Sequence, residues 1–131
     1  MQKDIVIPQA ENIYIVAKNE WDESISAALW NVYFINNREE KVDTVLVLSR
    51  GNNADKKTTT LRRNLGNVAP KSAIKIEFIS DEVLAFTNEY LVTFFAENLL
   101  LERKFTFAPN SIAEEKTVQL PVVNSKGIIA K

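Results

Sequence analysis

Short runs in which apolar and polar residues alternate constrain the fold of this chain more than any other feature of its sequence. The two clearest runs are residues 74–78 (Ile-Lys-Ile-Glu-Phe) and residues 103–107 (Arg-Lys-Phe-Thr-Phe). Successive side chains of an extended strand point to opposite faces, so a period of two indicates a strand with one buried face. The sequence therefore predicts β-strands rather than helices at these two places.

The same pattern predicts which side chains form the core. Within residues 74–78 we expect Lys75 and Glu77 to face water, because they alternate with three apolar side chains. Large apolar side chains are the ones most often buried in proteins. The expected core residues are Trp30, Val32, Phe34, Ile74, Ile76, Phe78, Phe105 and Phe107.

Turn residues divide the chain into further strands. The sequence contains only 3 Gly and 4 Pro, so each of them marks a break. The expected strands are residues 4–7, 12–18, 26–35, 42–49, 58–61, 71–79, 89–96, 99–107 and 117–123. We interpret residues 29–49 as a hairpin and residues 117–123 as an edge strand, because that segment contains Pro121.

Two short segments have features of a helix. A brief helix over residues 22–29 is an alternative to strand there, because Trp21, Ile25 and Leu29 recur every four residues. The connector at residues 80–88 contains one helical turn if Ser80 acts as its N-cap. Neither segment is long enough to connect parallel strands.

The strand spacing predicts an all-β fold, an immunoglobulin-like antiparallel β-sandwich of seven to nine short strands. Helices long enough for parallel crossovers are absent from the pattern, which disfavours an α/β sheet. A chain of 131 residues is large enough for one domain with its own core. We assign residues 1–123 to the sandwich and expect residues 124–131 to form a frayed C-terminal tail.

The chain contains no Cys and no His, which removes the commonest nucleophile, the commonest general base and the softer metal ligands. Adjacent carboxylates such as Asp22–Glu23 and Asp81–Glu82 lie in expected turns, where acidic residues are common. The motifs of phosphate-binding loops, serine hydrolases and zinc proteases are also missing from the sequence. We therefore expect a protein that is not an enzyme and that uses no cofactor or metal.

We expect a cytoplasmic protein from the net charge, the absence of Cys and the N-terminal residues. The formal net charge is −1, so no overall field attracts nucleic acid or a membrane. A chain without Cys fits a reducing compartment. The first residues lack the apolar segment of a secretory signal, and no apolar run reaches the length of a membrane span.

Two expected strands, residues 42–49 and 89–96, are apolar on both faces, which indicates an interaction surface. If these strands are neighbours, one sheet carries an apolar outer face, and large exposed apolar patches mark interfaces. The simplest partner is a second copy of the chain. The alternative is that the C-terminal tail or the connector at residues 81–87 covers the patch. The candidate interface residues are Tyr33, Ile35, Leu46, Leu48, Leu91 and Phe95.

Basic residues are concentrated between positions 50 and 75, a segment that contains seven Lys and Arg but only one acidic residue, Asp55. Such a cluster is typical of a site for a phosphate-bearing ligand or nucleic acid. The alternative is a solvated loop and edge strand, where Lys and Arg discourage pairing between sheet edges. The candidate anion-binding residues are Arg50, Lys56, Lys57, Arg62 and Arg63.

Four segments carry a resemblance to known proteins: residues 30–37 (WNVYFINN), 45–51 (VLVLSRG), 56–59 (KKTT) and 88–95 (NEYLVTFF). Through them the chain resembles a group of short uncharacterised bacterial proteins, some of which are labelled phenylalanyl-tRNA synthetase alpha subunit. This chain has neither the length nor the class II motifs of such a subunit, so the resemblance implies a small module and carries over no functional residues. Residues 65–76 also resemble a turn of immunoglobulin-like modules, which favours that fold.

The leading functional hypothesis is a non-enzymatic protein-binding or scaffolding module that self-associates. It would meet a protein partner through a sheet face or an exposed edge. The alternative is binding of a phosphate-bearing ligand or nucleic acid through residues 50–75. An enzyme that works through carboxylates or Lys is the third hypothesis.

Overall fold

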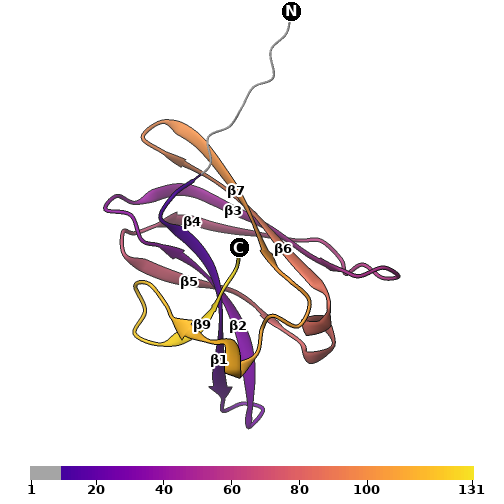
Figure 1. Cartoon of the computed structure of the whole chain (residues 1–131). Coiled ribbons are helices and arrows are strands. Elements are labelled where there is room, and N and C mark those ends of the chain that lie inside the picture. The colour runs from indigo at the N-terminus through magenta and orange to yellow at the C-terminus, as the bar shows by residue number, and fades with distance from the viewer. Residues whose placement is uncertain (1–9) are drawn as a thin grey trace, which may run out of the picture.

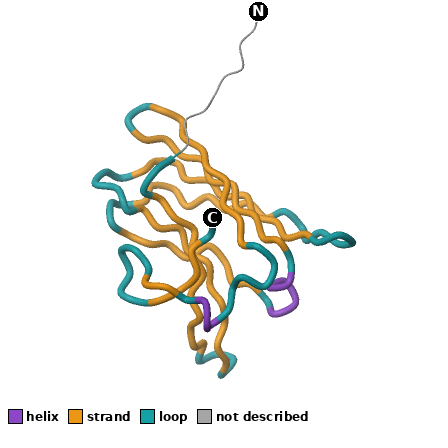
Figure 2. The backbone as a smooth tube through the Cα atoms, in the orientation of Figure 1, coloured by secondary structure: helices purple, strands orange, loops and turns teal. Residues whose placement is uncertain are grey.

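The computed structural model of the chain describes residues 10–131, so the strand expected at residues 4–7 lies outside the described residues. Strands dominate this range (Figure 2), and its two helices are short 3-10 turns. The all-β prediction is therefore confirmed. The elements are β1 (Ile13–Asp22), β2 (Ala27–Asn36), β3 (Val42–Asn52), β4 (Leu61–Val68), β5 (Ser72–Ile79), η1 (Asp81–Ala85), β6 (Thr87–Ala96), β7 (Leu99–Phe107), η2 (Glu114–Lys116), β8 (Val118–Gln119) and β9 (Lys126–Ile129).

The strands form two sheets whose paired strands are all antiparallel (Figure 1). The five-stranded sheet has the order β5-β2-β1-β9-β8, and the four-stranded sheet has the order β4-β3-β6-β7. One cluster of buried apolar side chains takes residues from both sheets. The two sheets therefore pack as a β-sandwich around a shared core.

Alternation along β2 and β7 supplies much of that core. Trp30, Val32 and Phe34 of β2 are buried, and so are Phe105 and Phe107 of β7, which confirms the prediction for these five residues. Burial of aromatic and branched side chains is the main favourable contribution to the stability of such a sandwich.

Strand β5 departs from the predicted alternation. Val32 pairs with Glu77 and Tyr33 pairs with Lys75, so the residue between them has no partner and forms a β-bulge. The bulge reverses the faces of the strand after it. Phe78, expected in the core, is 56% exposed, whereas Ile79 is buried. Glu77, expected in water, is turned toward the space between the sheets.

Residues 29–49 do not form the expected hairpin. Strand β2 pairs with β1 and β5, and β3 pairs with β4 and β6, so the two strands lie in different sheets. The fully buried Asn36 explains the change of sheet. Its side-chain amide donates to the carbonyl oxygens of Glu40 at 3.0 Å and Ala69 at 3.1 Å, which ties the connection to the next turn.

The C-terminal residues are part of the sandwich, so the expectation of a frayed tail is wrong. Strand β9 pairs with β1 through Val16 and Ala17. Beyond β9, Lys131 exchanges two backbone hydrogen bonds with Thr106 of β7, at 2.7 and 3.0 Å. The chain end thus joins the five-stranded sheet to the edge of the four-stranded sheet. Strand β8 lies at a sheet edge, as expected, and ends before Pro121.

Of the two segments considered for helix, the connector forms a helical turn and residues 22–29 do not. The connector before β6 contains η1, as expected, but Ser80 makes no side-chain cap hydrogen bond. The alternative helix over residues 22–29 does not form, because β1 and β2 pair as far as Asp22 and Ala27. The Asp22 carboxylate accepts hydrogen bonds from the amide and the hydroxyl of Ser24, at 2.9 and 2.6 Å, which stabilise the turn between the strands.

Candidate functional site

The six candidate interface residues lie on two different sheets. Tyr33 and Ile35 belong to β2 of the five-stranded sheet. The other four candidates belong to β3 and β6, which are neighbours in the four-stranded sheet. The structure therefore does not bring the six side chains into one patch.

The outer face of the five-stranded sheet is covered by the chain itself. Ile35 is fully buried in a small cluster with Val16 and Leu120, and Leu120 comes from the segment between β8 and β9. The Tyr33 hydroxyl donates a hydrogen bond of 2.7 Å to Glu20. Burial, and next this hydrogen bond, raise the pKa of Tyr33 to about 12. The residue that covers this face thus comes from the segment expected as an edge strand, residues 117–123, and not from the tail expected at residues 124–131.

The outer face of the four-stranded sheet carries an apolar patch that remains at the surface. Leu48 pairs with Leu91, Phe95 pairs with Leu100, and Leu46 lies on the same face of β3. Phe95 and Leu46 are each 44% exposed, and Leu100 is 40% exposed. We call these five residues the apolar patch. The sequence does not single out Leu100, because only residues 103–107 of β7 alternate between polar and apolar side chains.

Charged side chains surround the apolar patch. The Glu89 carboxylate accepts from Arg50 and from Lys104, each at 3.0 Å. Hydrogen bonds from Lys104 and then Arg50 hold the pKa of Glu89 below its usual value. Glu102 pairs across the strands with Thr93, and Arg62 pairs with Leu48. The patch is therefore bordered by side chains of both signs.

The five candidate anion-binding residues do not converge. Arg50 lies on the outer face of β3 and is bound to Glu89. Lys56 and Lys57 lie in the loop between β3 and β4, and Arg62 and Arg63 are neighbours in β4 whose side chains alternate. Arg50 and Arg63 both line one cavity, from which Lys56, Lys57 and Arg62 are absent. This spread leaves no single concave site that all five could form.

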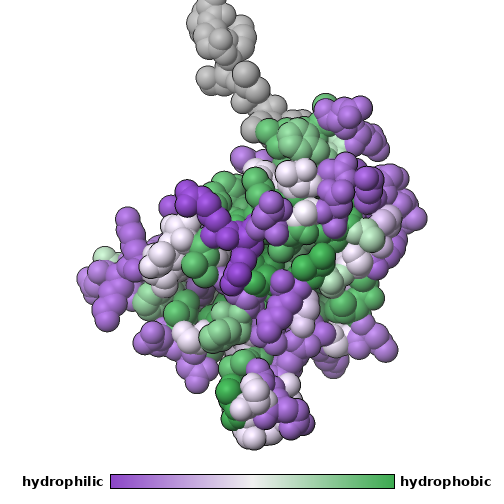
Figure 3. Space-filling view, turned by 180° about the vertical axis from the view of Figure 1, so that it is seen from behind, coloured by the Kyte–Doolittle hydropathy of each residue, from purple (hydrophilic) through white to green (hydrophobic). Residues whose placement is uncertain are grey.

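Large apolar side chains also reach the surface elsewhere. In the view from behind Figure 1, hydrophobic residues gather in the middle of the surface and hydrophilic residues border them (Figure 3). Single exposed apolar residues are normal on protein surfaces. Outside the patch, the exposed large hydrophobic residues within residues 10–131 are Trp21, Ile25, Leu61, Phe78, Leu99, Val118 and Val122.

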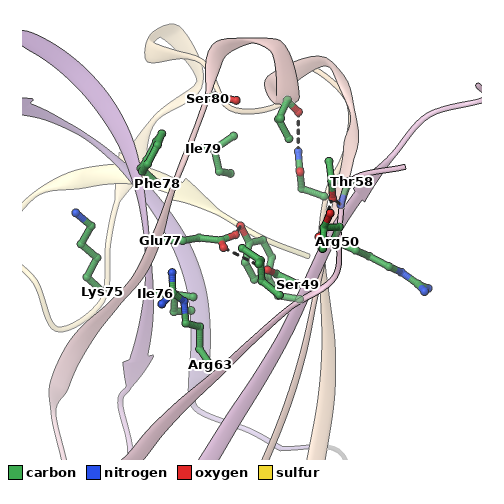
Figure 4. A pocket seen from close by; sticks show the side chains of 16 residues that line it. Ser49, Arg50, Thr58, Arg63, Lys75, Ile76, Glu77, Phe78, Ile79 and Ser80 are labelled. Carbon is green, nitrogen blue, oxygen red and sulfur yellow. Dashed lines mark hydrogen bonds between the residues drawn. The ribbon is translucent and has the colours of Figure 1, made fainter. Parts of the chain in front are cut away.

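A cavity of about 550 Å³ opens between the two sheets, where the edge strands β4 and β5 face each other. The ends of β3 and β6 form its inner wall, and Leu61 and Arg63 of β4 form one side. Figure 4 shows the Glu77 side chain directed from β5 toward Ser49, whereas Lys75 and Phe78, which also line the cavity, lie on the other side of the strand. The β5 bulge therefore decides which side chains of the strand face the inner wall.

The inner wall of the cavity is polar. The Tyr90 hydroxyl donates to the Glu77 carboxylate at 2.7 Å, and the Ser49 hydroxyl donates to it at 3.3 Å. Both donors are almost fully buried. Burial, and next the Glu77 charge, raise the pKa of Tyr90 well above its usual value, so its hydroxyl remains a donor. The sequence did not predict that Ser49, Glu77 and Tyr90 meet, because the alternating pattern gives no sign of the bulge.

Within residues 10–131 no group of three or more His, Cys, Asp or Glu side chains is placed to hold a metal ion. In the same range no helix is long and apolar enough to cross a membrane. Comparison of the chain with protein-family models, curated proteins and solved structures found no match.

Proposed function

We propose that the chain is a non-enzymatic, immunoglobulin-like binding module that self-associates through the apolar patch. The strand order supports the immunoglobulin-like class, because β5-β2-β1 opposes β4-β3-β6-β7 as in sandwiches of that class. Immunoglobulin domains carry a tyrosine near the start of strand F whose hydroxyl bonds to the backbone. Tyr90 lies near the start of β6, the corresponding strand, but its hydroxyl bonds to the Glu77 carboxylate. The core Trp lies on β2, one strand earlier than in antibody domains.

The observation that carries the proposal is the apolar patch on a sheet face that the rest of the described chain leaves open. The same chain covers the outer face of its other sheet with Leu120, so leaving the second face open is not a general property of the fold. Contiguous apolar surface on a protein is typical of an interface. A stable dimer needs roughly 1,000 Å² or more of total buried surface, which a face of four strands can supply.

A second copy fits the patch because the charges around it are self-complementary. Consider a two-fold axis that lies in the interface and crosses the strands between Leu46 and Leu48. It reverses the strand direction and places Glu102 of one copy opposite Lys104 of the other. It also places Asp43 opposite Arg50. At the centre Leu46 of one copy meets Leu48 of the other, whereas Phe95 lies opposite Glu89. The two opposite-charge pairs and the leucine centre support a symmetric interface.

The test is the oligomeric state of the full chain, measured by sedimentation equilibrium across a range of concentrations. We expect a dimer that Leu46→Glu converts to a monomer, because a charge at the centre of the patch would be buried without a partner. Leu61→Glu is the matched control, since Leu61 is also 44% exposed but faces the cavity. A wild-type chain that stays monomeric at about 100 µM, above the Kd range of functional dimers, refutes self-association.

The charged residues around the axis are tested separately from the apolar patch. We expect Glu102→Lys to weaken the dimer by about threefold to tenfold, because two lysines would then face each other across the axis. Glu115→Lys, which makes the same charge change away from the patch, should leave the dimer unchanged. Equal effects of the two substitutions would reject the two-fold arrangement.

Binding of a phosphate-bearing ligand or nucleic acid through residues 50–75 stays a prediction. The candidate residues lie on different surfaces, so no single observation favours it. The cytoplasmic location and the resemblance to short bacterial proteins also stay expectations.

A further inference from the structure

The cavity between β4 and β5 has the size and the position of a small-molecule site. Its volume of about 550 Å³ lies within the range of ligand pockets. It opens at the side of the sandwich where both sheets end in an edge strand. Ile76, Ile79 and Val83 give it an apolar lining, and Ser49, Glu77 and Tyr90 give it a polar centre.

The polar centre is a carboxylate whose partners in the described chain are neutral. A carboxylate offers about four acceptor positions, and Glu77 uses one for Tyr90 and one for Ser49. Among the ion pairs formed within residues 10–131, none involves Glu77. Arg50, Arg63 and Lys75 also line the cavity, but none of them forms an ion pair with Glu77. A carboxylate held between two sheets is best stabilised by a cation, so its remaining acceptor positions favour a positively charged ligand group.

The fold keeps this carboxylate in place. Tyr90 and Ser49 are 1% and 5% exposed, so the two donors are fixed by packing. The bulge in β5 turns Glu77 toward them, and Figure 4 shows its side chain directed across the gap toward Ser49. A charged group oriented by buried hydrogen bonds, next to an apolar wall, is the usual construction of a binding pocket.

We propose that this cavity binds a primary ammonium group on an aliphatic chain, with the ammonium at Glu77 and the chain along Ile79 and Val83. An ammonium supplies up to three donors and fits the free acceptor positions of the carboxylate. Arg63 lies at the side of the cavity and offers a partner for a carboxylate at the far end of the ligand. A free ω-amino acid uses both groups, whereas a lysine side chain of a protein uses only the first.

Amide chemical shifts of the full chain, followed during titration with 5-aminopentanoate, pentylamine and pentanoate, test the proposal. We expect saturable shifts at Glu77, Ile79 and Val83 with both amines, with a dissociation constant of about 1 mM for molecules of this size. Tighter binding of 5-aminopentanoate identifies a free amino acid as the ligand, and tighter binding of pentylamine identifies a lysine side chain. Shifts with pentanoate alone, or with none of the three, overturn the proposal.

Two substitutions with opposite effects separate the site from a general loss of structure. Glu77→Gln keeps an acceptor for Tyr90 but removes the charge, and we expect it to weaken amine binding about tenfold or more. Arg63→Gln removes a positive charge from the cavity, so pentylamine should bind a few times more tightly. Glu115→Gln serves as the carboxylate control. Amine binding that Glu77→Gln leaves unchanged would falsify the assignment.

Discussion

Tyr90 links the two sheets through a single hydroxyl group. The residue lies on β6 of the four-stranded sheet, and it donates to Glu77 on β5 of the five-stranded sheet at 2.7 Å. A polar group this deeply buried is tolerated only when it is hydrogen-bonded. The bond therefore fixes the width of the cavity at its inner end, and it depends on the phenol keeping its proton.

Tyr33 makes the fold sensitive to alkaline pH in a similar way. Burial and the bond to Glu20 raise its folded-state pKa to about 12, whereas the unfolded chain releases the proton near the ordinary tyrosine value of about 10. The stabilisation is therefore complete below pH 10 and is lost as the pH rises toward 12. We expect the free energy of unfolding, measured in urea, to fall across this interval.

Tyr33→Phe is the control for the alkaline loss, because phenylalanine has no proton to release. The variant should show a smaller decline of stability between pH 10 and 12 than the wild type. Tyr90, whose pKa is also raised, contributes to the decline that remains. An identical pH dependence in both proteins would mean that the Tyr33 phenol does not contribute.

At the scale of a single element, β5 shows what alternation predicts and what it omits. The pattern of residues 74–78 identifies the strand correctly, because any extended segment with one buried face produces it. It contains no information about register, since a bulge depends on how the strand pairs with β2. Faces are therefore predicted correctly before the bulge and incorrectly after it. Glu77 in the cavity is the functional result of that shift.

The bulge predicts unequal costs for two neighbouring substitutions. Ile79→Ala should lower the free energy of unfolding by about 3 kcal/mol, because it empties a buried position. Phe78→Ala should cost less than about 1 kcal/mol, because Phe78 is 56% exposed. Urea unfolding of the two variants measures both values. The opposite ranking would indicate uninterrupted alternation through β5.

The connection between β2 and β3 illustrates a second limit. Two adjacent apolar strands separated by a short polar turn predict a hairpin, and the local sequence gives no reason to expect otherwise. The connection changes sheets because Asn36 bonds to a turn more than thirty residues away, at Ala69. Such long-range partners cannot be read from a local pattern.

At the scale of the whole molecule, the fold class was predictable and the arrangement of the surfaces was not. Strand-forming periodicity extends over most of the chain, so an all-β sandwich follows from the sequence. The patch and the candidate basic residues depend on which strands share a sheet, and strand order is set by contacts distant in sequence. For that reason Ile35 and Leu46, expected on one surface, lie on different sheets.

The C-terminal strand contributes to global stability, and Gly127 tests this. A Cβ atom at this position would clash with the carbonyl oxygen of Ala17, so Gly127→Ala must push β9 away from β1. We expect a loss of about 2 kcal/mol in the free energy of unfolding. Gly66→Ala provides a comparison, because Gly66 has a positive φ of 67° but open space around it. Backbone strain alone should cost about 1 kcal/mol there.

The pairing of β1 with β9 has a consequence for synthesis of the protein. Val16 pairs with Ile129, so the ribosome adds 112 residues between the two partners. Throughout that time one side of β1 has free amide and carbonyl groups, and such an edge recruits other strands. Late protection of the Ala17 amide in pulsed hydrogen exchange would register this delay. The nascent chain is most vulnerable to mispairing on the strand that emerges early and is completed last.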